Sequence, residues 1–163
     1  MMADTAGTAN TTDATVTIRP VRLADAVILN QHCWPERSCE DVLEFLQRTH
    51  KLTQNRRGVG VVALCMGALC GFGMLTLWPR AAEISDLIVS PDFRSQGIGS
   101  RIIAYLAQYA AHLNVQTLEI GVALSNPRAL ALYRRLGFVD GRVIELDLGH
   151  GPEPVLYLYQ NLG

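Results

Sequence analysis

Residues 94–99 read Arg-Ser-Gln-Gly-Ile-Gly and stand between an apolar run, Ala82–Val89, and a segment with helical periodicity, Gly97–Leu113. The glycines allow the backbone positive φ angles and a close approach to a ligand. The free amides that open a helix bind phosphate, and Arg94 adds a positive charge. The stretch therefore predicts a strand, a pyrophosphate-binding turn and a long helix. A strand–glycine–helix turn without any ligand would show the same pattern.

Two common phosphate-binding motifs are excluded at this turn. Ile102 and Ile103 stand where the third glycine of a dinucleotide-binding fingerprint would fall. No Gly-Lys-Ser/Thr sequence follows the glycines, so the turn is not a P-loop. The kind of phosphate ligand must therefore be inferred from other parts of the chain.

In the rest of the chain, β-branched runs indicate strands and amphipathic segments indicate helices. Asp25 and Ser38 are expected to be the N-caps of two early helices. We expect further helices at Gly97–Leu113 and Pro127–Leu136, and strands at Val16–Arg19, Val59–Leu64, Leu69–Leu77, Ala82–Val89, Thr117–Leu124, Val143–Leu148 and Pro154–Tyr159. This order predicts an α/β (α+β) fold, a mixed sheet with helices on both faces.

Composition limits the function classes. The 163 residues fit one domain, and 49% hydrophobic with 18% charged residues excludes wholesale disorder. The net charge of -1 provides no global basic field for nucleic acid or an anionic membrane. Residues 1–14 lack a basic start and an apolar run. We expect a disordered tail there, a single domain at residues 15–163 and a cytoplasmic location.

One long stretch, Gly58–Pro79, contains 22 residues without a charge. Such a length can span a bilayer as a helix. The stretch also divides into two β-rich runs around the turn at residues 66–68, and two central strands buried on both faces have this composition. We favour the two strands.

Cysteine and histidine spacing predicts no metal site. Cys33, Cys39, Cys65 and Cys70 match no paired zinc or redox motif, and the four histidines are scattered. We expect four free thiols, buried or half-buried, in a reducing compartment.

A second motif lies downstream of the turn, where Asn126 is followed by Ala129, Tyr133 and Gly137-Phe138. Together with Arg94-x-x-Gly97-x-Gly99 after a strand that ends in Val89, this pattern resembles the GNAT superfamily of N-acetyltransferases. The two motifs cover residues 82–138, and the pair is far more specific than either motif alone. The resemblance implies a mostly antiparallel sheet in which the fourth strand splays from the fifth.

The resemblance also implies an acetyl-CoA site. The pantetheine arm would pair with the exposed strand edge, and a backbone N–H near Val89 would face the thioester carbonyl. Asn126 would hydrogen-bond the arm. The residues implied at the cofactor are Leu87, Ile88 and Val89 on the strand, Arg94, Ser95, Gln96, Gly97, Ile98, Gly99 and Ser100 at the turn, and Asn126 and Tyr133 downstream.

Tyr133 stands where the family places a general acid, which would protonate the departing thiolate. A core aromatic on an amphipathic helix has the same spacing. Glu83, fourteen residues before Gly97, matches the glutamate base of the histone-acetylating branch. The branch that acetylates ribosomal proteins places its glutamate where Gly121 stands here. Glu119, on the same strand face, is the alternative to Glu83, and a water chain or no dedicated base is a third.

Asp86 lies inside an apolar run, where a charge needs a partner or must face a ligand. It would either bind the ammonium of the substrate or pair with a nearby arginine.

The sequence thus indicates an acetyl-CoA-dependent N-acyltransferase that acts on a primary amine of a small molecule or peptide, by direct attack in a ternary complex. No cysteine falls within the motifs, which disfavours a thiol nucleophile. The alternative is a non-catalytic acyl-CoA-binding sensor or scaffold of the same fold. The identity of the acceptor, the acyl-chain preference and the oligomeric state stay open, although members of the family often form homodimers.

Overall fold

A single seven-stranded sheet organises the protein, for which the computed structural model describes residues 15–163; the tail expected at residues 1–14 lies outside the described residues. The strand order is β1-β2-β3-β4-β5-β7-β6, and every neighbouring pair is antiparallel except β4 and β5. The strands are β1 (Val16–Pro20), β2 (Gly58–Cys65), β3 (Ala68–Leu77), β4 (Ala81–Val89), β5 (Thr117–Ala123), β6 (Val139–Asp147) and β7 (Pro152–Asn161). The predicted mixed, mostly antiparallel sheet is confirmed.

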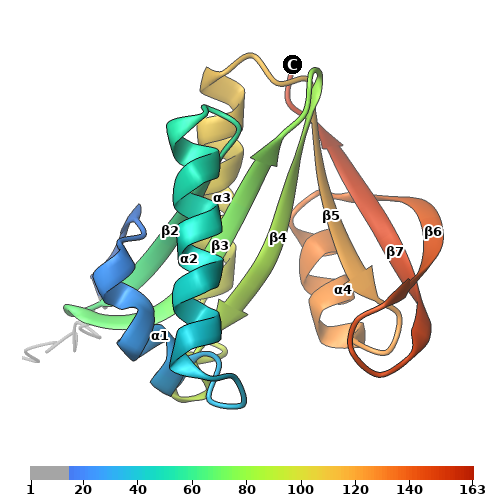
Figure 1. Ribbon diagram of the computed structural model, residues 1–163. Helices are drawn as coiled ribbons and strands as arrows, with labels where there is room; N and C mark the ends of the chain where they lie inside the picture. Colours follow the sequence, from blue (N-terminus) through green and yellow to red (C-terminus); the bar gives the residue numbers. More distant parts are fainter. Residues whose placement is uncertain (1–14) are drawn as a thin grey trace, which may run out of the picture.

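Helices cover both faces of the sheet (Figure 1). The first two, α1 (Ala26–His32) and α2 (Cys39–Gln54), pack on one face around Trp34 and Phe72. The other two, α3 (Ile98–His112) and α4 (Pro127–Arg135), share a larger apolar core on the opposite face. Two short 3₁₀ turns, Leu23–Asp25 and Pro91–Phe93, lead into α1 and toward α3.

The long uncharged stretch forms two adjacent interior strands of this sheet. It makes up β2 and β3, and seven of the eight residues of β2 are buried. Both faces of these strands are therefore covered, which explains a composition without charge. No helix within residues 15–163 is long and apolar enough to cross a membrane.

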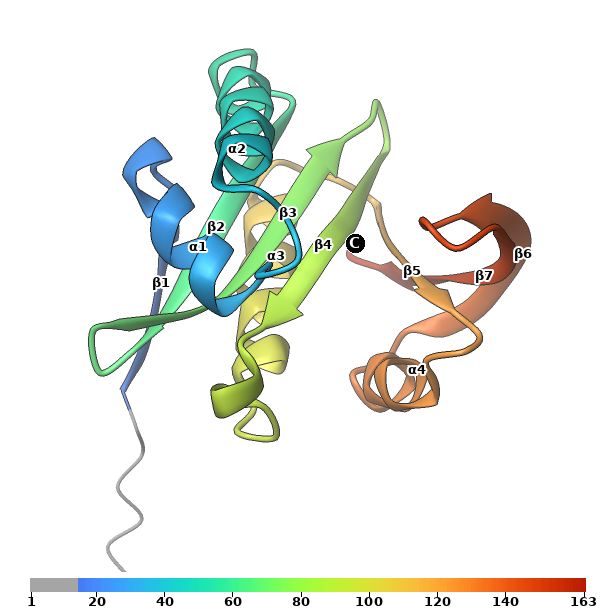
Figure 2. The ribbon, with the colours of Figure 1, turned by 60° about the horizontal axis from the view of Figure 1, so that its bottom comes forward.

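The parallel strands β4 and β5 part along their length. They pair from Ala81 to Ile84 only, and beyond that point β4 keeps its hydrogen bonds to β3 alone while β5 pairs with β7. Figures 1 and 2 both show the two strands diverging from a common end. The divergence coincides with a β-bulge, where Asp86 adopts a φ of 52° and the β3–β4 register shifts. A bulge bends a strand and increases its twist, which accounts for the splay.

Three expectations need correction. Strand β6 begins at Val139 rather than Val143, because a bulge between Asp140 and Val143 interrupts the alternation on which the prediction rested. Asp25 does not cap α1 through its side chain, which accepts instead from the Arg22 amide at the start of the 3₁₀ turn. It already has helical φ and ψ at the end of the 3₁₀ turn, and its carboxylate accepts bonds from both Arg19 side-chain nitrogens at 2.8 Å. Cys39 is exposed, while the other three free cysteines are buried.

Other local predictions are confirmed. The Ser38 hydroxyl accepts a hydrogen bond from the Asp41 amide at 3.0 Å and caps α2. Gly137, with a φ of 96°, ends α4 as expected of a C-terminal glycine. Both helices therefore begin or end where the sequence pattern indicates.

Candidate active site

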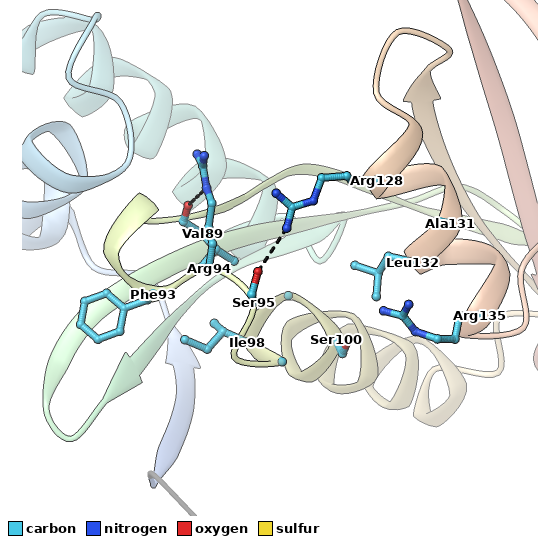
Figure 3. A pocket seen from close by; sticks show the side chains of 12 residues that line it. Val89, Phe93, Arg94, Ser95, Ile98, Ser100, Arg128, Ala131, Leu132 and Arg135 are labelled. Carbon is cyan, nitrogen blue, oxygen red and sulfur yellow. Dashed lines mark hydrogen bonds between the residues drawn. The ribbon is translucent and has the colours of Figure 1, made fainter.

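A cavity of about 570 Å³ lies between the turn before α3 and the facing side of α4 (Figure 3). Val89, the last residue of β4, also contributes to its wall, so the cavity adjoins the parted strand edge. The lining residues are Val89, Phe93, Arg94, Ser95, Gly97, Ile98, Gly99, Ser100, Arg128, Ala131, Leu132 and Arg135.

The turn itself presents backbone to this cavity. Gly97 has a φ of 79° and is the N-cap of α3, and a side chain there would meet nothing within 4 Å. Gly99 lies within the helix without a positive φ, so only one of the two glycines has the expected backbone. The first turn of a 15-residue helix leaves its amides unpaired and carries the positive end of the helix dipole. The arrangement suits an anion.

Arginines from α4 add positive charge opposite the turn. Arg128 and Arg135 both line the cavity, and Arg128 Nη2 donates to Ser95 Oγ at 3.1 Å. They lie seven residues apart, which is two helical turns, so they share one face of α4 with Leu132 (Figure 3). The motif match missed these two arginines, although their spacing of seven residues, two turns of the expected helix, was available in the sequence.

Arg94 and Gln96 are placed differently from the rest of the turn. Arg94 Nε donates to the carbonyl oxygen of Val89 at 3.2 Å, and its side chain rises along the strand end rather than toward α4 (Figure 3). Gln96 is exposed and does not line the cavity, whereas Ser95, Ile98 and Ser100 do.

The edge of β4 beside the gap carries free backbone groups. The Ser90 amide donates to Cys70 of β3, so the alternation of an antiparallel ladder turns the Val89 N–H and C=O away from β3, toward the gap. By the same alternation Ile88 is turned toward β3. Because Arg94 already binds the Val89 carbonyl, the Val89 N–H is the free group at this position.

Two motif residues lie on α4. Asn126 is its N-cap, and Asn126 Oδ1 accepts from the Ala129 amide at 3.2 Å, which leaves its NH₂ group for a ligand. Tyr133 is 7% exposed and packs near Phe138 in the main core. Burial raises the pKa of Tyr133, and its hydroxyl makes no hydrogen bond to another described residue. A neutral phenol with an unused proton is a competent acid.

Carboxylates gather on the face of the sheet opposite α4. Glu83 of β4 lies directly beside Glu119 of β5 in the parallel register. Burial raises the pKa of Glu83, and Glu119 raises it further, while Arg142 acts in the opposite direction. Asp86 is exposed on the bulge, and no arginine within residues 15–163 pairs with it.

Arg142 and Tyr157 complete this group. Arg142 Nη2 lies 3.7 Å from Glu119 Oε2, and its guanidinium lies 5.3 Å from the centroid of the Tyr157 ring. We call Glu83, Glu119, Arg142 and Tyr157 the open-face cluster. Sequence reasoning found the two glutamates but not Arg142 and Tyr157, which come from strands without a motif.

No three His, Cys, Asp or Glu side chains of the described chain come together in a way that could hold a metal ion.

Comparison with known proteins identifies the fold family. The family model for the acetyltransferase (GNAT) family matches residues 24–138, more than half of the chain. This chain belongs to the GNAT family. A GNAT relative, an uncharacterized N-acetyltransferase of Methanocaldococcus jannaschii, is 38% identical over 66 residues, 40% of this chain and 29% of the relative. The ribosomal protein bS18-alanine N-acetyltransferase of Escherichia coli is 27% identical over 97 residues, 60% of this chain and 66% of the relative.

Solved structures agree on the GNAT fold. An acetyltransferase of Salmonella typhimurium that modifies the N-terminal serine of ribosomal protein L7/L12 aligns with a TM-score of 0.82 at 18% identity, covering 91% of this chain and 96% of that one. A ribosomal L7/L12 α-N-acetyltransferase in complex with coenzyme A aligns at 0.80 and 20% identity, covering 91% and 94%. The chain spans 29% to 66% of the length of the curated relatives named above.

Proposed function

We propose that the protein is an acetyl-CoA-dependent N-acetyltransferase that transfers the acetyl group to a primary amine by direct attack. The observation that carries this proposal is the continuity of the site. The open edge of β4 connects the cavity beside α3, through Val89, with the half-buried Glu83 near the point where β4 and β5 part. The edge from Ser85 to Val89 spans four residue steps, or about 13 Å at ~3.3 Å per residue.

The residues around the cavity fit the cofactor. The α3 amides after Gly97, together with Arg128 and Arg135, would hold the pyrophosphate. The Val89 N–H would pair with the pantetheine arm as an added strand does, and the Asn126 NH₂ group would bind the arm from the other side. These contacts fix the thioester relative to the acceptor, and alignment of this kind supplies much of the rate enhancement in bimolecular transfers.

Proton transfer falls to two side chains. Glu83 would take the proton that the acceptor ammonium must lose before its nitrogen can attack. Its raised pKa makes it a stronger base than an exposed glutamate. Tyr133 would give its proton to the departing thiolate of coenzyme A, which its neutral, unpaired hydroxyl permits. A backbone N–H on the free β4 edge would stabilise the charge that develops on the carbonyl oxygen.

The acceptor would approach the face that carries the open-face cluster, because α3 and α4 cover the other side. The two L7/L12 acetyltransferases named above modify an N-terminal serine and an α-nitrogen, and a peptide N-terminus is accordingly among the acceptors to test, together with lysine side chains and polyamines.

The test combines binding and turnover. Calorimetry should show one acetyl-CoA site, and a thiol-release assay against a panel of peptide, amino-acid and polyamine amines should show acceptor-dependent turnover. Glu83→Gln is the matched control, since it should retain cofactor binding and lose turnover. Tight binding with no thiol release for any amine would instead support an acyl-CoA sensor, and absence of binding would refute both functions.

A further inference from the structure

Four charged or polar side chains converge on the face of the sheet that carries α1 and α2, over strands that lie beyond these two helices (Figure 1). Glu83 comes from β4, Glu119 from β5, Tyr157 from β7 and Arg142 from the outermost strand, β6. In β5 the buried residues alternate with Glu119 and Gly121, which places these two on the face opposite α4. The cluster therefore joins four neighbouring strands on one surface.

Arg142 owes its position to two backbone features. The bulge between Asp140 and Val143 sets Arg142 out of the regular β6 register. Gly121 lies beneath the Tyr157 ring, and a Cβ at that position would lie 3.2 Å from two of the ring carbons. The absent side chain lets the ring lie against β5, where it forms the surface over which the guanidinium rests at 5.3 Å.

The guanidinium contacts only one of the two adjacent carboxylates. Arg142 Nη2 lies 3.7 Å from Glu119 Oε2, and no ion pair or hydrogen bond within residues 15–163 involves the Glu83 side chain. Two neighbouring glutamates in one parallel ladder repel each other, and the guanidinium distinguishes them because it pairs with Glu119 and not with Glu83.

We propose that Arg142 is a positioning residue for the acid–base step: resting on Tyr157, it pairs with Glu119 and leaves Glu83 as the carboxylate that exchanges the proton of the acceptor. This inference rests on the proposed function, in which Glu83 is the base. In the step, the N–H bond of the acceptor ammonium breaks and the proton binds a Glu83 carboxylate oxygen. The freed electron pair on nitrogen forms the C–N bond to the thioester carbonyl carbon, the C–S bond breaks, coenzyme A leaves as the thiolate that Tyr133 protonates, and the amide nitrogen loses its remaining extra proton to solvent.

The charges that face Glu83 come from each strand of the cluster and from its own strand. Asp86 on β4 and Glu119 on β5 disfavour ionisation of Glu83, Arg142 on β6 favours it, and Tyr157 on β7 is neutral. Burial raises the pKa of Tyr157, and the two glutamates raise it further, so its phenol keeps its proton beside them. Removing Arg142 should therefore raise the pKa of Glu83, and removing the charge of Glu119 should lower it.

The test is an NMR titration of the glutamate carboxylates in the full chain without cofactor, with Glu83→Gln used to assign the Glu83 resonance. Arg142→Met should raise the pKa of Glu83 by roughly half a pH unit or more, and Glu119→Gln should lower it by a similar amount. In the double variant the two shifts should largely cancel. High salt should shrink both shifts, because Arg142 is 64% exposed.

Two further variants separate this role from a merely structural one. Arg142→Lys keeps the charge and should leave the titration of Glu83 close to that of the wild type. Arg134→Met removes a comparable exposed Arg–Asp pair, with Asp140, and should have no effect on Glu83. An unchanged titration of Glu83 in Arg142→Met would overturn the proposal.

The same variants are then assayed for the pH dependence of kcat/KM. The acidic limb should move to higher pH in Arg142→Met and to lower pH in Glu119→Gln, in step with the NMR values. If the carboxylates titrate as expected but the limb does not move, Arg142 has no part in the acid–base step and this inference fails. If instead no acetyl-CoA-dependent turnover exists in the wild type, the proposed function fails, while the NMR result still decides the electrostatic arrangement.

Discussion

Glu83 lies directly opposite Glu119 in the parallel ladder between β4 and β5, one position before the last paired residues of the two strands. The strands thus bring two carboxylates together immediately before they part. Paired strands fix the backbone of both residues, so neither glutamate can relieve the repulsion by a large movement of its chain. Their electrostatic coupling is therefore a property of the fold.

Glu83→Gln should lower kcat/KM by about 100-fold, the usual contribution of a general base, with little change in acetyl-CoA affinity. The wild-type rate should rise with pH as Glu83 ionises, at a pH above the ordinary glutamate value of 4.5 because its pKa is raised. Steady-state kinetics over a pH series provide the measurement. A wild-type acidic limb that persists unchanged in the variant would contradict the assignment of Glu83.

The same substitution should also stabilise the protein at neutral pH. A pKa raised in the folded state means that the native protein binds the proton more tightly, so stability falls as pH rises from the ordinary value of 4.5 through the folded pKa. Glu83→Gln removes the titrating carboxylate and therefore this loss of stability. Thermal unfolding should show a higher Tm for the variant near neutral pH and a smaller difference below the ordinary value; an equal or lower Tm at neutral pH would speak against it.

A large side chain in place of Gly99 should weaken binding of the cofactor. A Cβ at this position would lie 3.8 Å from Val89 Cγ2 and 4.0 Å from Leu132 Cδ2, which is ordinary contact, so Gly99→Ala should bind nearly as the wild type does. Gly99→Phe would extend into the cavity and should weaken acetyl-CoA binding about tenfold or more, or ~1.4 kcal/mol. Calorimetry on both variants, with circular dichroism to verify folding, measures the effect. Equal acetyl-CoA affinities of Gly99→Phe and the wild type would show that the cofactor does not bind in this cavity.

Tyr133→Phe tests the general acid. The hydroxyl makes no hydrogen bond to the described residues, so its removal should leave the melting temperature close to that of the wild type. Loss of a general acid should lower kcat by about 100-fold while the Kd for acetyl-CoA changes far less. The expected rate loss should shrink for a thioester whose thiolate is a better leaving group. An unaltered kcat under conditions where chemistry limits turnover would assign Tyr133 to the core alone.

The Arg19–Asp25 pair should contribute to stability in a pH-dependent way. Although burial acts to raise the pKa of Asp25, the bonds from Arg19 and from the Arg22 amide prevail and lower it. The stabilisation should be complete above the ordinary aspartate value of 3.8 and be lost as pH falls through the folded pKa. Asp25→Asn should cost about 2 kcal/mol at neutral pH, measured by urea unfolding. Asp140→Asn, at an exposed Arg–Asp pair, is the control and should change stability little.

Much of this molecule could be predicted from local pattern. The helical spacing of Ile98 and Ile102, the Ser38 cap and the Gly137 stop all depend on interactions within a few residues, and all agree with the structure. The turn at Gly97 could likewise be predicted, because a strand, a glycine and a helix follow one another directly in the chain.

What escaped prediction depends on contacts between distant segments or on irregular backbone. The bulge in β6 interrupts the alternation of residues along the strand, so a period-two pattern did not include its first residues. The Asp25 side chain binds Arg19 instead of capping the helix that it precedes. Arg142 and Glu119 come close because β7 pairs with both β5 and β6, which places these two strands near each other. No local sequence pattern indicates this strand order. The cofactor half of the candidate site was thus more readily predicted than the acceptor half.

The hydrogen bond from Arg94 to the Val89 carbonyl also bears on the tendency of the free protein to aggregate through its strand edges. Strand edges with unpaired backbone groups invite pairing with a neighbouring chain, and here two such edges lie in the middle of a sheet. Arg94 occupies an acceptor on one of them with a charged side chain, as charged residues protect the outer strands of many sheets. We expect Arg94→Ala to aggregate more readily than the wild type when acetyl-CoA is absent.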